Sequence, residues 1–257
     1  MSDQQNNEEC PKDPQHPQPT IFSFGFRCSS ASLLKKIGIK NESYPFDWLI
    51  SKLSVIQHSI EDDFVQFLDQ ANYHRKYTNT YEMADSNNHF ICDEHLMVNK
   101  FYQPPELEDV ENTYKCYLAM NHHNITETKD HEYYIRCVAR LTTLLKSPHT
   151  KCYVHITPLI TKAKYVQEVD NIHMECICFH TFMETQTTNI NGLVFIMVRE
   201  EGRNYHHIEK THDASGQTIY VVYTNQHFID AGECFMGHCH DETESLKHII
   251  MSKYNSL

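Results

Sequence analysis

The sequence lacks a long apolar run and lacks an excess of basic residues. No segment approaches the roughly 20 consecutive apolar residues of a membrane-spanning helix, so we predict no membrane span. Lysine and arginine together number 22, against 34 aspartate and glutamate residues, which gives a formal net charge of −12. Because nucleic acids and anionic membranes attract basic surfaces, this balance argues against both as the main partner.

The first 19 residues lack the apolar core of a signal peptide. They are rich in Gln, Asn, Glu and Pro, so we predict a disordered tail over residues 1–19. The ten cysteines are too sparse in 257 residues to form a disulfide scaffold. Because reduced thiols are typical of the cytosol, we predict a cytoplasmic protein.

Four common catalytic and nucleotide-binding motifs are also missing. The chain has no Gly-x-Gly-x-x-Gly after its first predicted strand and no Gly-x-x-x-x-Gly-Lys-Ser/Thr loop. It has no Gly-x-Ser-x-Gly turn and no His-Glu-x-x-His helix. These absences argue against a dinucleotide oxidoreductase, a P-loop NTPase, a common serine hydrolase and a zincin metalloprotease.

Apolar runs alternate with helical patterns along the chain. The runs 20–26, 151–156, 192–198 and 218–223 indicate strands, and the last three have the composition of strands that are buried on both faces. Helical patterns are predicted over residues 29–37, 48–60, 61–71, 130–146, 163–185 and 242–253, a further strand over 114–120, and loops with short strands over 72–112. This alternation predicts an α/β fold, with one domain over residues 20–257 and a mixed or mostly parallel sheet flanked by helices.

Cys28 is the cysteine whose local sequence argues for chemistry. It follows the first predicted strand and precedes a helix that has serines at its start and Gly38 after its end. The N-terminus of a helix offers unpaired N–H groups and about half a positive charge. Thiols in such places ionise more readily, so the pattern predicts a reactive thiolate at Cys28. A small core residue is the structural alternative.

Two motifs at a fixed offset resemble those of a known family. They are Ser23-Phe24-Gly25-Phe26-Arg27-Cys28 and Pro45-Phe46-Asp47-Trp48. They are similar to the Ser-Leu-Gly-x-x-Cys and Pro-Phe-Asp-Trp motifs of the "putative papain-like cysteine peptidase" family of bacteria and large DNA viruses, with Phe24 where the family commonly has Leu. The resemblance continues at Phe64, Phe67 and Leu68, at His122 and His123, at Arg136 and Arg140, and at Cys152 to Ile156. The many Asn, Lys, Ile and Tyr residues favour a viral source, in which case the cytoplasm would be that of the host.

The resemblance implies a cysteine-dependent hydrolase or peptidase that acts on a peptide or isopeptide bond without a cofactor. Cys28 would be the nucleophile and a histidine its base. His123 is the first candidate and His122 the second, because adjacent residues at a strand end point in opposite directions. Asp47 would orient the imidazole, although it is equally suited to cap the helix predicted after it.

Three further residues are expected to contact the substrate. Arg27 would favour a thiolate or hold an anionic group. The N–H groups of Cys28 and Ser29 would form an oxyanion hole at the helix start, and Trp48 would line the site or pack beneath it. The substrate is predicted to be a protein or a small molecule. Two other functions stay open: an α/β protein that binds a carbohydrate or nucleotide without a covalent step, and a non-catalytic interaction protein.

Two segments are rich in the residue types that bind zinc. One contains His173, Cys176, Cys178 and His180, and the other contains Cys234, His238, Cys239 and His240. Neither has the Cys-x-x-Cys spacing of a zinc ribbon. On a helix, thiols at such spacings are commonly core residues, so we predict no metal site.

Overall fold

The computed structural model of the protein describes residues 18–25, 28–78, 94–104, 117–120, 122–200, 202, 206–214, 216–224 and 240–257. The tail predicted for residues 1–19 lies outside this set, except for residues 18 and 19, which belong to no helix or strand.

The main sheet is mostly parallel. Its strands follow the order β1-β6-β8-β10-β9, and the short strand β7 pairs with β8. Their bounds are β1 (Thr20–Ser23), β6 (Lys151–Ile156), β7 (Ile160–Thr161), β8 (Ile190–Arg199), β9 (His207–Ala214) and β10 (Gln217–Thr224). The pairings are parallel except between β9 and β10, which form an antiparallel edge. The predicted α/β fold with a mostly parallel sheet is confirmed.

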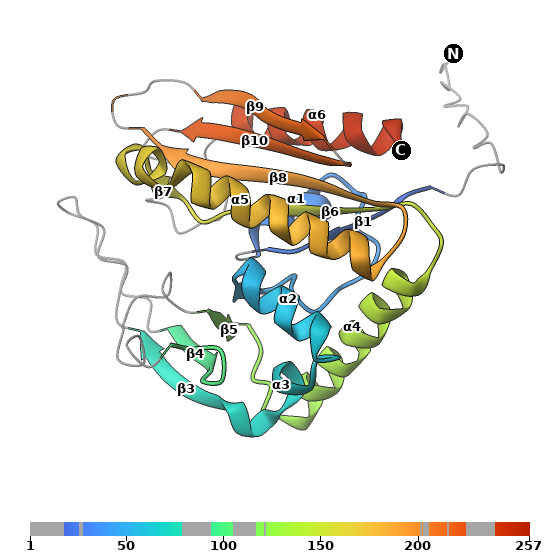
Figure 1. Ribbon diagram of the computed structural model, residues 1–257. Coiled ribbons are helices and arrows are strands. Elements are labelled where there is room, and N and C mark those ends of the chain that lie inside the picture. Colours follow the sequence, from blue (N-terminus) through green and yellow to red (C-terminus); the bar gives the residue numbers. More distant parts are fainter. Residues whose placement is uncertain are drawn as a thin grey trace, which may run out of the picture.

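Helices cover both faces of the main sheet (Figure 1). Helices α1 (Ser29–Lys36) and α6 (His240–Ser256) pack on one face, and the long helix α5 (Lys162–Gln186) packs on the other. Alternate residues of β6 face opposite layers. Val154 belongs to the cluster with Leu33 of α1, whereas Tyr153 belongs to the cluster with Phe179 of α5. Burial on both faces explains why these strands are near-continuous apolar runs in the sequence.

A second sheet, which the sequence did not reveal, lies beside the main one. It is antiparallel, with the order β2-β5-β4-β3. Its strands are β2 (Leu49–Ser51), β3 (Tyr73–Thr78), β4 (Glu94–Asn99) and β5 (Leu118–Met120). Helix α2 (Leu53–Glu61) lies between α5 and this sheet, and α4 (Thr128–Lys146) runs along the side of the molecule (Figure 1).

The structure corrects two predicted helices. The helix predicted from Trp48 begins only at Leu53, because residues 49–51 pair with β5 as strand β2. The helix predicted over 61–71 is reduced to α3 (Val65–Leu68) and the short 3₁₀ turn η1 (Gln70–Asn72). The cause is local: Asp63 and Phe64 adopt positive φ angles of 53° and 62°, which end α2.

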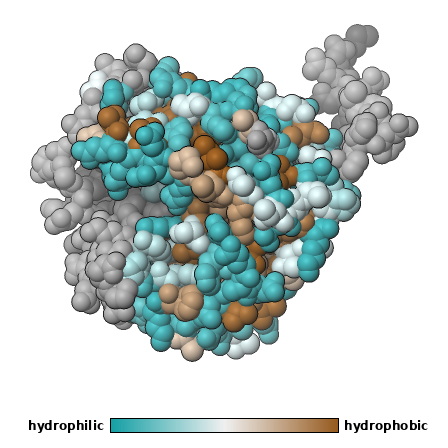
Figure 2. All heavy atoms as spheres, viewed as in Figure 1, coloured by the Kyte–Doolittle hydropathy of each residue, from teal (hydrophilic) through white to brown (hydrophobic). Residues whose placement is uncertain are grey.

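The face of the molecule in Figure 2 is mainly polar. Polar and charged side chains cover most of the face shown in Figure 2, and apolar side chains interrupt them in a few patches. Of the large apolar residues that the structure describes, the most exposed are Val65, Phe101, Ile135, Val166 and Met174. Among the described residues, none of the helices combines the length and the apolar character that crossing a membrane requires.

Candidate active site at the carboxyl ends of strands β1 and β6

Cys28 precedes helix α1 at the end of the first strand. Residue Phe24 continues the pairing of β1 with β6, because its N–H donates to the carbonyl of Val154 at 3.0 Å. Cys28 is then the N-cap residue of α1, and its carbonyl accepts the N–H of Ser32 at 2.8 Å. The Cys28 side chain is half-buried. Ser29, the first residue of the helix, is half-buried too, and Arg27 lies outside the described residues.

The other described cysteines differ from Cys28. Cys137, Cys152 and Cys176 are buried. Burial raises the thiol pKa of Cys152 and of Cys176 to about 12, and it raises the pKa of Cys137 as well. Cys178 on α5 is exposed but lies in the middle of a helix. Among the described cysteines, Cys28 alone combines partial exposure with a place at a helix N-terminus, where a thiolate is stabilised.

Asp47 is fully buried and joins the two sequence motifs. The hydroxyl of Ser23, in the first motif, donates to one carboxylate oxygen of Asp47. The other oxygen accepts from Lys40 Nζ at 2.5 Å and from the N–H of Tyr44 at 2.6 Å. Burial raises the pKa of Asp47, and the ammonium group of Lys40 and the three hydrogen bonds oppose that rise. Asp47 therefore fixes the turn before β2 against the end of β1.

His123 has a different carboxylate partner. Its Nδ1 lies 3.2 Å from Oδ1 of Asp130 in the first turn of α4, and its ring stacks on Tyr133 with a centroid separation of 4.7 Å. Asp47 and His123 make no hydrogen bond with each other among the described contacts. His122 is exposed, and Trp48 is half-buried just before β2. The catalytic roles assigned to His123, His122 and Asp47, and the substrate contact assigned to Trp48, stay predictions.

His155 lies beside the strand that leads to Cys28. It stands near the carboxyl end of β6, the parallel neighbour of β1. Its Nδ1 contacts the carbonyl oxygen of Phe24, so Nδ1 carries the hydrogen and Nε2 keeps its lone pair. One residue further on, the N–H of Ile156 donates to the hydroxyl of Ser30 in α1 at 3.2 Å. These two contacts hold the end of β6 against both ends of the segment that carries Cys28.

His155 is not among the residues that the sequence motifs predict for the site. The run Lys151 to Ile156 has the appearance of an ordinary core strand, because four of its six residues are of apolar or aromatic type. One signal was available. Open α/β sheets place ligands beyond the carboxyl ends of their strands, and His155 is the titratable residue nearest that end of the run. Burial lowers the pKa of His155 to about 4, so the imidazole is neutral at pH 7.

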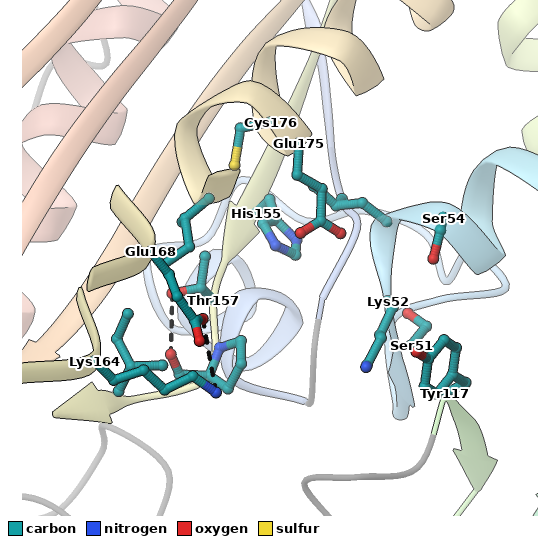
Figure 3. A pocket seen from close by; sticks show the side chains of 14 residues that line it. Ser51, Lys52, Ser54, Tyr117, His155, Thr157, Lys164, Glu168, Glu175 and Cys176 are labelled. Carbon is teal, nitrogen blue, oxygen red and sulfur yellow. Dashed lines mark hydrogen bonds and ion pairs between the residues drawn. The ribbon is translucent and has the colours of Figure 1, made fainter. Parts of the chain in front are cut away.

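A cavity of about 400 Å³ opens beside His155 (Figure 3). It lies between the β2–α2 junction, the chain that follows β6, and one face of α5. Its polar lining consists of Ser51, Lys52, Ser54, Tyr117, His155, Thr157, Lys164, Glu168 and Glu175. Cys28 is not among the described residues that line it. The volume is within the range of small-molecule sites.

The first segment that is rich in zinc-ligand residues lies on α5. His180 is buried, and its Nδ1 lies 3.1 Å from the hydroxyl of Tyr153, while Cys176 is packed in the core. Within the part of the chain that the structure describes, no group of three or more His, Cys, Asp or Glu side chains is arranged to hold a metal ion. The second segment, from Cys234 to Cys239, lies outside that part, and so does the side chain of His240.

The family model "Putative papain-like cysteine peptidase (DUF1796)" matches residues 19–202. The match spans more than half of the chain, from before β1 to just beyond β8, and it includes Cys28, Asp47 and His155. The chain belongs to this family, as its two motifs indicated. Neither the curated proteins nor the solved structures contain a significant match.

Removing the Asp47 carboxylate should strongly destabilise the fold. We expect Asp47→Ala to lower the free energy of unfolding by about 3–5 kcal/mol, because the ammonium group of Lys40 would stay buried without its partner. The double variant Lys40→Met/Asp47→Leu should recover part of that loss. Urea unfolding followed by circular dichroism measures both. The control is Lys210→Met, which breaks an exposed pair with Asp213 and should leave stability unchanged. Equal stability of Asp47→Ala and Lys210→Met would contradict the structural role.

The buried His155 should make stability depend on pH. Its pKa is about 4 in the folded protein and about 6.5 in an unfolded chain, so the folded state disfavours protonation. The free energy of unfolding therefore contains a contribution from neutral His155 that is complete above pH 6.5. About 3 kcal/mol of it is lost as the pH falls to 4. In His155→Asn, whose amide can still donate to the Phe24 carbonyl, this contribution is absent. The difference in unfolding free energy between the two proteins should therefore change between pH 7 and pH 4, and parallel curves would show that His155 is not held neutral.

Proposed function

We propose that this protein is a cysteine-dependent acyl hydrolase, with Cys28 as its nucleophile and His155 as its general base. The proposal extends what membership of the cysteine peptidase family supports. The observation that carries it is the junction of β1, α1 and β6. There a partly exposed thiol starts a helix, and the neighbouring parallel strand presents a histidine whose Nε2 has no hydrogen-bond partner among the described residues.

The chemistry follows from these groups. As the sulfur of Cys28 attacks the carbonyl carbon of an amide, its proton passes to Nε2 of His155. The carbonyl oxygen becomes an anion, which N–H groups at the start of α1, including that of Ser29, would stabilise. The C–N bond then breaks, and the leaving amine takes the proton from Nε2. Water hydrolyses the resulting thioester and releases free Cys28.

Three observations support His155 over His123 in this role. His155 is fixed in the required tautomer by its contact with Phe24, whose strand leads to the thiol. Its neighbour Ile156 contacts the first turn of α1 through Ser30. His123, in contrast, pairs with Asp130 at the start of α4 and stacks on Tyr133. The Cys28 thiol and Nε2 make no direct hydrogen bond here, as is common before substrate binds.

One observation favours a second function, which is ligand binding without a covalent step. The cavity is bounded by His155 but not by Cys28. If the protein only binds its ligand, Cys28→Ser should keep full affinity and no variant should change a reaction rate. Hydrolysis that depends on Cys28 would exclude this alternative.

Substitution of each candidate residue should separate these functions. On a library of fluorogenic peptide and thioester substrates, Cys28→Ser should lower kcat/KM by about 10³-fold or more, since a hydroxyl is a much weaker nucleophile. His155→Asn should lower it by about 10²–10⁴-fold, because it removes the base but can keep the hydrogen bond to Phe24. His123→Asn serves as the matched control and should retain activity. A loss with His123→Asn and none with His155→Asn would assign the base to His123 instead.

A further inference from the structure

Two opposite charges face the cavity without a counterion in contact. Lys52 places its ammonium nitrogen 3.6 Å from the ring centroid of Tyr117, a cation–π contact, and makes no ion pair with a described residue. Glu175, on α5, likewise makes no hydrogen bond or ion pair there. Burial raises the pKa of Glu175, and the charge of Lys52 opposes that rise, so the two groups interact across the cavity without touching.

The other charged pair of the lining is already neutralised. Lys164 and Glu168 lie one turn apart on α5, 3.9 Å from each other, and both are about half exposed. They form the rim of the cavity (Figure 3). The charges that a ligand would meet without competition are therefore those of Lys52 and Glu175.

The start of α2 offers unpaired backbone N–H groups that can bind an anion. Its N-cap residue, Lys52, makes no side-chain capping hydrogen bond. The N–H groups of Leu53 and Ser54 have no acceptor among the described residues, and both residues line the cavity. Unpaired N–H groups at a helix N-terminus favour a carboxylate or another anion. The Lys52 ammonium group stands at the same end of the helix.

His155 supplies an independent sign that a ligand belongs here. Its side chain is only 4% exposed, yet it lines the cavity and its Nε2 has no partner among the described residues. Because this nitrogen keeps its lone pair, it can accept a hydrogen bond from a molecule bound in the cavity.

We propose that this cavity binds a zwitterion of the amino acid or short peptide class. Its carboxylate lies at the N-terminus of α2 and Lys52, and its ammonium group lies at Glu175. This inference rests on the proposed function in one respect: the bound molecule would be a substrate or a product of the acyl hydrolase, because His155 borders the same cavity.

Binding should be measured on Cys28→Ser protein, so that hydrolysis plays no part. The probes for titration calorimetry are alanylleucine, its N-acetyl derivative, its C-terminal amide and free leucine. We expect the unblocked dipeptide to bind, and either block to weaken binding by about tenfold or more, because each removes one charge-assisted contact. Glu175→Gln should abolish the difference in affinity between the free and the N-acetylated dipeptide. Lys52→Met, which keeps an apolar stem over Tyr117, should abolish the difference in affinity between the dipeptide and its C-terminal amide.

Glu168→Gln is the matched control, since it changes a carboxylate on the same face of α5 that is already paired. In this variant, N-acetylation and C-terminal amidation should each still weaken binding of the dipeptide. Circular dichroism on every variant confirms that it is folded. Equal binding of blocked and free dipeptides, or binding of none of the four probes, would overturn the inference. The result is separate from the proposed function: zwitterion binding with no activity in the wild type would contradict only the hydrolase, and hydrolysis of blocked peptides alone would contradict only the zwitterion site.

Discussion

The buried carboxylate of Asp47 is the interaction on which the arrangement of the site depends. It binds the end of β1 through Ser23, the loop after α1 through Lys40, and its own turn through the N–H of Tyr44. The segment between Ser23 and Asp47 contains Cys28 and the whole of α1. Closing this segment at its base fixes where the helix starts, and so where its N-terminus meets the thiol.

This role explains why the two sequence motifs occur together. Ser23 belongs to the first and Asp47 to the second, and they are in direct contact although 24 residues separate them. Phe24 and Phe46 pack against each other in the same core, with ring centroids 5.9 Å apart. The Pro-Phe-Asp-Trp motif is thus part of the architecture that supports the site. Burying an aspartate is tolerable here because a lysine and two further donors compensate for lost hydration.

The sequence was a good guide to the apolar strands of the main sheet and to the long helices, and a poor guide to the second sheet. Strands such as β6 and β8 are buried on both faces, so they are apolar runs that composition alone identifies. The second sheet has short strands, and β2 has only three residues, within what looks like a helical pattern. Pairing with distant β5 decides its conformation, and no local signal shows such a contact.

The site was predictable in the same uneven way. Cys28 could be identified because a helix start has local signals. His155 could not be connected to the strand that leads to Cys28, because its contact with Phe24 arises from the parallel pairing of two strands that lie about half the chain apart. The family name also suggests a papain-like arrangement of a helical half and an antiparallel half. In this chain the thiol instead stands at the edge of a mostly parallel sheet, where α/β proteins place their ligands.

The most direct test of this account is the rate at which iodoacetamide labels each cysteine of the native protein, followed by peptide mass spectrometry across pH. The account predicts that Cys28 is labelled much faster at neutral pH than Cys178, which is exposed but lies within a helix. It also predicts that His155→Asn removes this advantage and His123→Asn does not. If Cys28 is labelled only on unfolding, or no faster than Cys178, the strand-end thiol is a packing residue and the proposed chemistry is wrong.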